Sequence, residues 1–232
     1  MKSQYLSLPT RSLRLSIAPM ALAAALLMSA GAPELAAQDA RSVLERASAR
    51  HDALEGFCAD FAQEIEVTLL RETVRSRGEL CQARSDHFEM RWTDPAGDRI
   101  VADGTYLWVY FPSSDEGMVS RTRMAGIDGS FDLHREFLSD PGERYAATHE
   151  GMEEVDGRAV HVLHLTPQVP TQYRDARVWI DAEEFLIRKL VIEEAETESI
   201  RTIQLSGIRL NPVLPADRFA FVPPPGVQVI TR

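Results

Sequence analysis

The chain of 232 residues carries 25 Lys and Arg against 35 Asp and Glu, a formal net charge of −10. Such an acidic surface repels phosphate backbones and anionic headgroups, which excludes sequence-independent nucleic-acid binding. With 44% hydrophobic residues, the chain is long enough for one domain with a substantial core.

The first 37 residues have the pattern of a secretory signal peptide. Three basic residues precede the apolar core Met20–Met28, and small residues lead to Ala37. This core is far shorter than the roughly 20 residues that span a bilayer. We therefore predict cleavage after Ala37, or after Ala32, and a soluble exported domain of residues 38–232 with a net charge of −12. The alternative is an uncleaved anchor.

Residues 39–55 are predicted to form the first helix. Their apolar residues recur at roughly helical spacing, Asp39 or Ser42 can cap the N-terminus, and Gly56 can end the helix. His51 falls on the polar side of this helix, which predicts a solvated histidine.

From Phe57 onward the hydrophobic period changes to two, which is typical of strands that bury one face. Turn-forming residues recur roughly every 8–12 residues, which favours an all-β sandwich or barrel. Strands are expected at 57–69, 74–83, 87–93, 144–152, 158–166, 173–180, 185–194, 198–210, 217–222 and 227–230.

A hairpin is predicted within residues 98–112, where Asp103-Gly104 separates two β-prone runs. Asp and Gly tolerate the positive φ that a tight hairpin turn needs. The second arm, Tyr106–Phe111, is aromatic on one face and apolar on the other. Both faces must therefore be covered, either by protein or by a ligand.

The segment 113–129 is predicted to be a polar loop, and residues 130–139 a short helix. That helix brings Phe131 and Phe137, with two leucines, to one side. A loop and helix inserted in a sheet protein usually serve function rather than structure.

The two cysteines, Cys58 and Cys81, flank one predicted hairpin. The oxidising compartment of an exported protein favours a disulfide between them, with Cα atoms about 4.4–6.8 Å apart. Two buried free thiols are the alternative, and a metal site at this pair lacks supporting ligands.

The sequence offers little for catalysis. His161 and His164 are three residues apart, which puts them on opposite faces of a strand and disfavours a zinc site with His149. Glu183-Glu184 lies in a predicted turn, which indicates solvated surface rather than a glycosidase pair. The chain has no G-x-S-x-G elbow, P-loop or dinucleotide fingerprint. We predict a protein without enzymatic activity, cofactor or metal.

An apolar sheet face crossed by helices favours a cavity for an apolar ligand. Each buried methylene is worth about 0.8 kcal/mol, so an acyl chain leaves a membrane only for comparable burial. The predicted lining of this lipid cavity is Phe61, Ile65, Phe88, Met90, Trp92, Leu107, Val109, Phe131 and Phe137.

Six motifs in order resemble the outer-membrane lipoprotein carrier (LolA) family between about residues 42 and 229. The motifs are Phe57-x-x-x-Phe61-x-Gln63, Gly78-Glu79-Leu80 leading to Arg84, Phe88-x-Met90-x-Trp92-x-x-Pro95, Asp103-Gly104-x-x-Leu107-Trp108-x-Tyr110-x-Pro112, Trp179-Ile180-Asp181 with Ile187-Arg188-Lys189, and Leu214-Pro215-x-x-x-Phe219-x-Phe221-x-Pro223-Pro224-x-Gly226-x-x-Val229.

The resemblance implies a mainly β fold with a few helices, an incomplete antiparallel β-barrel of about eleven strands that an α-helical lid closes. It implies a periplasmic carrier of acylated lipoproteins or lipids, which we expect to be a monomer. Such a carrier takes its cargo from an inner-membrane transporter and passes it to an outer-membrane receptor.

The resemblance also implies roles for individual residues. Arg84 matches an arginine that latches the lid, for which the planar fork of donors suits it, and Phe88 matches a cavity aromatic. A solvated turn arginine is the alternative for Arg84. Ser85 replaces a usual proline, Met90 a frequent aromatic, and the lid helix is polar at 134–136. These departures bear on cargo and partner more than on fold.

A rival hypothesis from a different class is a periplasmic sensor with the same fold. It would bind a lipid or a mislocalised lipoprotein and so control a signalling partner. The known form of such a sensor has a second domain, for which we expect no room in this chain. Recovery of triacylated lipoproteins in a pull-down would favour the carrier, and recovery of one regulatory membrane protein would favour the sensor.

Overall fold

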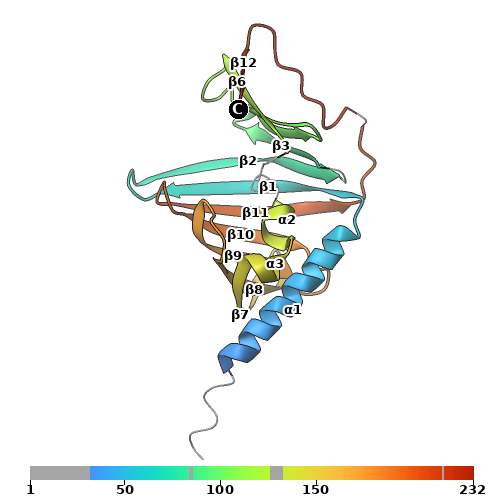
Figure 1. The fold of residues 1–232 in the computed structure, drawn as a ribbon, viewed down its shortest axis with the longest axis vertical. Helices are drawn as coiled ribbons and strands as arrows, with labels where there is room; N and C mark the ends of the chain where they lie inside the picture. Colours follow the sequence, from blue (N-terminus) through green and yellow to red (C-terminus); the bar gives the residue numbers. More distant parts are fainter. Residues whose placement is uncertain (1–31, 84–85, 126–132, 216) are drawn as a thin grey trace, which may run out of the picture.

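The computed structural model describes residues 32–83, 86–125, 133–215 and 217–232. Twelve strands form one sheet in the order β12-β6-β5-β4-β3-β2-β1-β11-β10-β9-β8-β7 (Figure 1). The strands are β1 (Gly56–Val67), β2 (Glu72–Ala83), β3 (His87–Asp94), β4 (Ala96–Asp103), β5 (Tyr106–Tyr110), β6 (Met118–Arg123), β7 (Tyr145–Val155), β8 (Arg158–Pro167), β9 (Tyr173–Asp181), β10 (Ile187–Glu194), β11 (Ser199–Leu210) and β12 (Gln228–Thr231).

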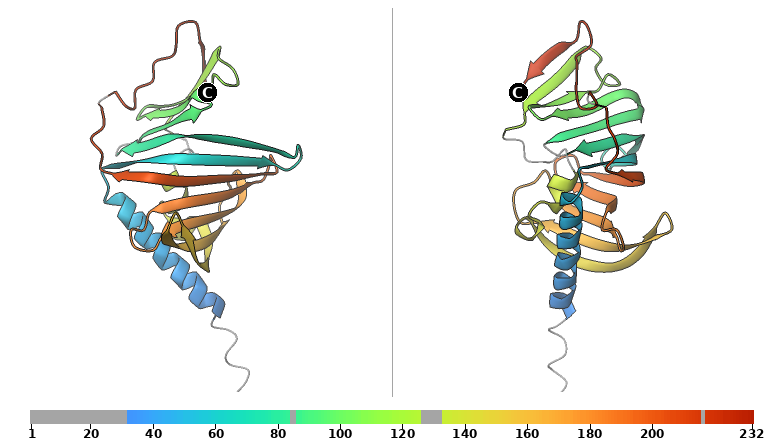
Figure 2. Two further views of the ribbon diagram at one scale, coloured as in Figure 1. Left: turned by 180° about the vertical axis from the view of Figure 1, so that it is seen from behind. Right: turned by 90° about the vertical axis from the view of Figure 1, so that its right-hand side faces the viewer.

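The sheet is curved but not closed, since β7 and β12 form its two edges (Figure 2). Neighbouring strands are antiparallel except β12 and β6, which run parallel. The prediction of a mainly β, open antiparallel barrel is confirmed, with twelve strands in place of about eleven.

Three helices lie on one face of the sheet: α1 (Ala32–Asp52), α2 (Leu133–Leu138) and α3 (Pro141–Arg144) (Figure 1). α1 begins earlier than the predicted Asp39, inside the predicted signal peptide, whose cleavage stays a prediction. Ala40, Val43, Leu44 and Ala47 are buried, as expected for one face of an amphipathic helix. Among the described residues, no helix is both long and apolar enough to cross a membrane.

The predicted disulfide joins Cys58 of β1 to Cys81 of β2. The two residues are direct cross-strand partners, with Cα atoms 4.1 Å apart. This separation is slightly below the predicted range, as direct partners on neighbouring antiparallel strands lie close together.

Replacing both Cys58 and Cys81 with alanine is expected to lower the free energy of unfolding by about 3 kcal/mol, because the bridge closes a loop with a sequence separation of 23. Urea unfolding of the variant and of the oxidised protein measures the difference. Wild-type protein in excess reductant is the control and should unfold like the variant. An unchanged unfolding midpoint in both would contradict the prediction.

The predicted hairpin is confirmed, with β4 ending at Asp103 and β5 beginning at Tyr106. Gly104 has a φ of 86°, and the Asp103 carboxylate accepts hydrogen bonds from the backbone N–H of Tyr106 at 2.7 Å and from Trp108 Nε1 at 2.7 Å. The Trp108 ring lies 5.4 Å from that of Phe221. The aromatic face of β5 is therefore covered by the C-terminal segment of the protein itself.

Two predictions about secondary structure are wrong. The predicted polar loop 113–129 contains β6, and the predicted strand 217–222 is turn and irregular structure. In β6 only Val119 is buried, because the strand lies near the edge of the sheet between β5 and β12. A single apolar residue leaves no period for sequence analysis to detect.

The motif around Asp181 has a structural role. Its carboxylate is 1% exposed and accepts hydrogen bonds from Arg158, from Arg188 at 3.1 Å, and from the backbone N–H of Glu184 at 2.9 Å. Burial opposes ionisation, but these donors hold the pKa of Asp181 well below its usual range. Glu183 in the same turn is 87% exposed, as the predicted solvated turn requires.

Candidate functional site

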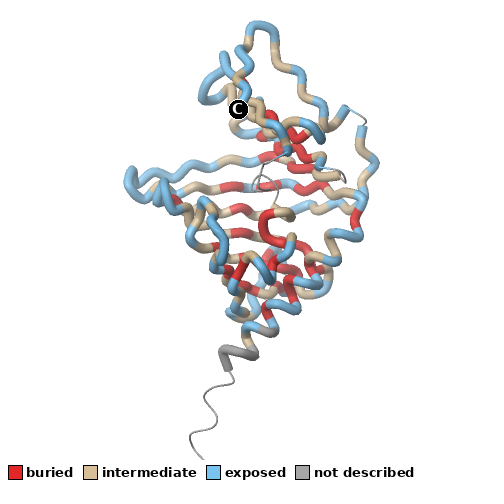
Figure 3. The backbone as a smooth tube through the Cα atoms, in the orientation of Figure 1, coloured by how far each residue is buried: buried red, intermediate tan, exposed pale blue. Residues whose placement is uncertain are grey.

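The helices and the sheet enclose one large apolar cluster. α1 contributes Leu44 and its neighbours, α2 contributes Phe137 and Leu138, and strands from both halves of the sheet complete it. Figure 3 shows that buried residues gather where the helices meet the sheet. We call α1 and α2 together the lid, because they cover this cluster.

Five of the predicted lining residues belong to this cluster: Phe61, Phe88, Met90, Trp92 and Phe137. Leu107 is half-buried and packs against it, whereas Ile65 and Val109 are half-buried outside it. Phe131 and Arg84 lie outside the described residues. Contact between any of these side chains and an acyl chain stays a prediction.

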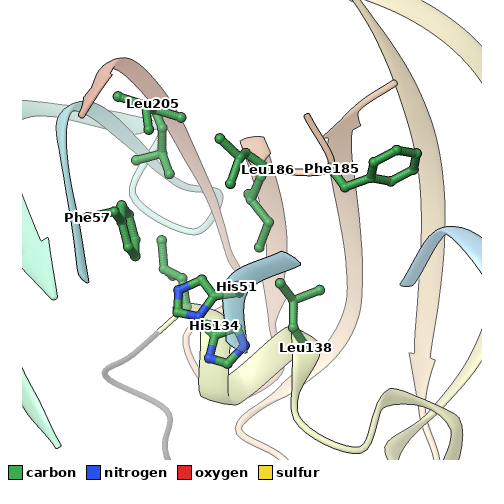
Figure 4. A pocket seen from close by; sticks show the side chains of 10 residues that line it. His51, Phe57, His134, Leu138, Phe185, Leu186 and Leu205 are labelled. Atoms are coloured by element: carbon green, nitrogen blue, oxygen red, sulfur yellow. The ribbon is translucent and has the colours of Figure 1, made fainter. Parts of the chain in front are cut away.

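A small apolar pocket lies between the lid and the sheet (Figure 4). Its lining comprises His51, Phe57, Leu133, His134, Leu138, Phe185, Leu186, Ile187, Leu205 and Ile208. The space open to the centres of water-sized molecules is about 30 Å³, which is room for a few water molecules. A long acyl chain needs far more space than this, so we expect loading to require the lid to move away from the sheet.

None of the eight predicted lining residues that the structure describes lines this pocket. The predicted set lies mostly on β1, β3 and β5, whereas the pocket is formed by the lid and the β10–β11 side of the sheet. The predicted helix had placed Leu133 and Leu138 on one side, and that signal could have found this part of the lining.

His51 of α1 and His134 of α2 hold the two lid helices together. Their rings are stacked, with centroids 3.3 Å apart and an interplanar angle of 8°, and Phe57 packs edge-on against His51 (Figure 4). The prediction that His51 is solvated is wrong. It followed from the polar side of one helix, but α2 approaches α1 on that side.

Both histidines are neutral at pH 7. Burial, and then the proximity of His134, lower the pKa of His51 to about 3, and a hydrogen bond with Gln82 opposes this shift. Burial lowers the pKa of His134 to about 4, although Asp52, at 3.8 Å, favours its charged form. Protonation of either ring therefore costs free energy while the lid is closed.

Glu136 fastens α2 to the sheet. This glutamate is 5% exposed, and its carboxylate accepts hydrogen bonds from Arg144 of α3 at 2.9 Å, from the Tyr145 hydroxyl at 3.1 Å and from the Tyr173 hydroxyl. The Tyr145 hydroxyl also lies 2.8 Å from the Glu136 carbonyl oxygen. Burial raises the pKa of Tyr145 to about 12, so its hydroxyl keeps its proton and remains a donor at neutral pH.

Arg135, which lies between His134 and Glu136 in α2, forms an ion pair with Asp86, just before β3. The polar stretch that distinguishes this lid helix thus makes contacts in three directions: His134 with α1, Arg135 with the β2–β3 connection, and Glu136 with α3, β7 and β9. These contacts are directional, so they fix the closed position of the helix more closely than apolar packing does.

His51, Asp52 and His134 bring potential ligand atoms within 4.8 Å of one another. The lone pairs of an imidazole lie in the plane of its ring. Two parallel planes 3.3 Å apart cannot both contain one ion, so the stacked pair does not fit a metal without rotation of a ring.

The three histidines predicted on strands, His149, His161 and His164, do not meet at one place. His149 Nε2 lies 3.1 Å from His161 Nδ1 across the β7–β8 pair, whereas His164 contacts Asp175 of β9. These different partners agree with the prediction that His161 and His164 lie on opposite faces of one strand.

A family model of the outer membrane lipoprotein carrier protein LolA matches residues 52–222. The outer-membrane lipoprotein carrier protein of Legionella pneumophila (strain Corby) is 25% identical over 199 residues, which cover 86% of this chain and 93% of that protein. The carrier protein of Dechloromonas aromatica (strain RCB) is 26% identical over 181 residues, which cover 74% and 79%.

Solved structures agree on the fold. An uncharacterised conserved protein from Thermus thermophilus superposes with a TM-score of 0.56 at 10% identity, covering 84% of this chain and 100% of that chain. MucB in the Pseudomonas aeruginosa MucA/MucB complex superposes with a TM-score of 0.50 at 17% identity, covering 84% and 64%. Because the family model spans well over half of the sequence, this chain belongs to the LolA family of outer membrane lipoprotein carrier proteins, which are carriers and not enzymes.

Proposed function

We propose that this protein carries acylated lipoproteins through the periplasm and holds their acyl chains in the apolar space beneath the lid. The observation that supports this most strongly is a lid that covers an apolar cluster and is fastened to it by polar contacts. Opening such a lid exposes apolar surface that an acyl chain can cover, at about 0.8 kcal/mol for each methylene.

The donor and acceptor of the cargo follow from the family. We propose a monomer that receives lipoproteins from an inner-membrane transporter and delivers them to an outer-membrane receptor. Arg84 as a lid latch also remains a proposal that rests on the family resemblance. The sensor hypothesis has weaker support, since the family model and the relatives are lipoprotein carriers.

Ile208→Glu is expected to weaken acyl-chain binding at least ten-fold, because Ile208 is half-buried in the pocket and a charge there opposes an apolar ligand. Binding is measured by release of a triacylated lipoprotein from membrane vesicles into a soluble complex with the protein. Ile200→Glu, at a half-buried position of the same strand outside the pocket, is the matched control. Equal binding by both folded variants would contradict an acyl site at this place.

A further inference from the structure

The β1–β2 hairpin projects from the side of the sheet (Figures 1 and 2). The two strands pair as far as Val67 and Glu72, which leaves residues 68–71 as the tip. β3 pairs with β2 only up to Arg77, so residues 72–76 of β2 have no strand on that side among the described pairs. The tip therefore lies at the end of the hairpin, beside the β10–β11 turn, where the Thr68 N–H donates to the Glu198 carbonyl oxygen at 3.4 Å.

Two adjacent leucines occupy this tip. Leu69 is 71% exposed and Leu70 is 66% exposed, and Val74 nearby is 52% exposed. Single apolar side chains are common on protein surfaces, but turns are normally built from Gly, Pro, Asn, Asp and Ser. Two leucines at the end of a projecting hairpin therefore indicate a contact with something apolar.

One face of the hairpin leads from the tip towards the large apolar cluster. Val74 is the direct cross-strand partner of Ile65, so both lie on the same face of the hairpin. By the alternation of a strand, Phe61 lies on that face as well, and it belongs to the cluster. Gln63 lies between Ile65 and Phe61 on this face and donates a hydrogen bond to Ser76 Oγ at 3.2 Å. The tip and the proposed acyl site are thus connected along one face of β1.

The charges of the hairpin also differ from those of the whole chain. Residues 64–77 contain three arginines and three glutamates, whereas the chain carries a net charge of −10. Arg75 is 72% exposed in its side chain, and Arg71 follows the leucines directly in the turn. The hairpin itself therefore carries no net charge to repel an anionic surface, whereas Glu196 and Glu198 lie in the adjacent β10–β11 turn.

We propose that Leu69 and Leu70 insert into the surface of a phospholipid bilayer, so that the carrier meets its target membrane directly. This rests on the proposed function, and it adds a membrane contact made by the carrier's own chain. A convex tip of two leucines beside arginines suits the bilayer interface, where apolar side chains reach the acyl region and arginines stay at headgroup level. Two leucines bury little area, which keeps the contact reversible.

The test is flotation of the protein with vesicles of phosphatidylethanolamine and phosphatidylglycerol, free of any protein. Leu69→Ser combined with Leu70→Ser is expected to lower the partition coefficient at least ten-fold. Val213→Ser combined with Val222→Ser is the matched control, since these side chains are 101% and 83% exposed elsewhere in the chain. The control should partition like the wild type.

Acyl-chain loading in solution separates this proposal from the proposed function. The leucine variant should load normally, and Ile208→Glu should bind vesicles normally. The bilayer proposal is overturned if the wild type does not float, if the leucine variant floats equally well, or if the leucines matter only when a receptor protein is present. Failure of loading in every variant would overturn the carrier function. The flotation result would then decide the bilayer contact independently.

Discussion

Glu136→Leu is expected to raise the fraction of empty molecules with an open lid by more than a hundred-fold. The change leaves the guanidinium of Arg144 and the hydroxyls of Tyr145 and Tyr173 without their shared acceptor in a buried place. Leaving a part-buried donor without its acceptor costs about 1–3 kcal/mol for each group. The Tyr145 hydroxyl still lies 2.8 Å from the carbonyl oxygen of residue 136. Most of this cost falls on the closed lid, because the open lid lets water reach the same groups.

The expected consequence for cargo is tighter binding. A protein that must open before it binds has an apparent affinity reduced by the fraction of molecules that are open. Glu136→Leu raises that fraction, so acyl chains should bind more tightly and be handed on more slowly. This is the opposite direction to Ile208→Glu, which makes the two variants distinguishable in one binding assay.

Hydrogen–deuterium exchange of the α2 and α3 amides measures the opening directly. Glu143→Gln is the matched control, because Glu143 is an exposed glutamate of α3. Urea unfolding of the sheet checks that the whole domain stays folded. Unchanged exchange in α2 with Glu136→Leu would show that the carboxylate does not fasten the lid.

Acidification is expected to open the lid as well. The closed state holds the pKa of His51 at about 3 and that of His134 at about 4, whereas an exposed histidine has a pKa near 6.5. The closed lid therefore keeps its full stability above about pH 6.5 and loses it progressively as the pH falls towards 4. At pH 5, the protonation of each histidine should raise the equilibrium constant for lid opening about 30-fold. The two together should raise it by up to about a thousand-fold.

The neighbours of the pair set the size of this effect. Asp52 lies 3.8 Å from His134 and favours its protonation, and Gln82 hydrogen-bonds His51.

Exchange of the α2 amides at pH 7.5 and pH 5.0 tests this expectation, after correction for the intrinsic pH dependence of exchange. Replacing both His51 and His134 by phenylalanine should remove most of the pH dependence, since phenylalanine keeps an aromatic ring but takes up no proton. His87→Phe is the control, because His87 packs against Phe219 of the C-terminal segment. An equal slope in wild type and double variant would contradict the role of the pair.

Much of the fold could be predicted from the sequence because its signals are local. Alternating apolar residues located most strands, Asp103-Gly104 located a hairpin turn, and the flanking positions of Cys58 and Cys81 located the disulfide. Each of these depends on residues close together in the chain. β6 escaped detection because it buries a single apolar side chain.

The contacts that hold the lid closed depend on the tertiary structure. The sequence shows that 134–136 is polar, but it does not show what those side chains meet. His51 and His134 stack only because α2 returns to α1 after the intervening strands of the sheet, and Glu136 is satisfied only because β7 and β9 bring two tyrosines beside it. A periodic pattern reports which face of an element is apolar, whereas the partner of a polar side chain depends on how distant elements approach one another. For that reason the residue pattern by itself determined an all-β fold with an apolar sheet face, and the family resemblance implied that the barrel is incomplete. Only the tertiary structure decided how the lid is held.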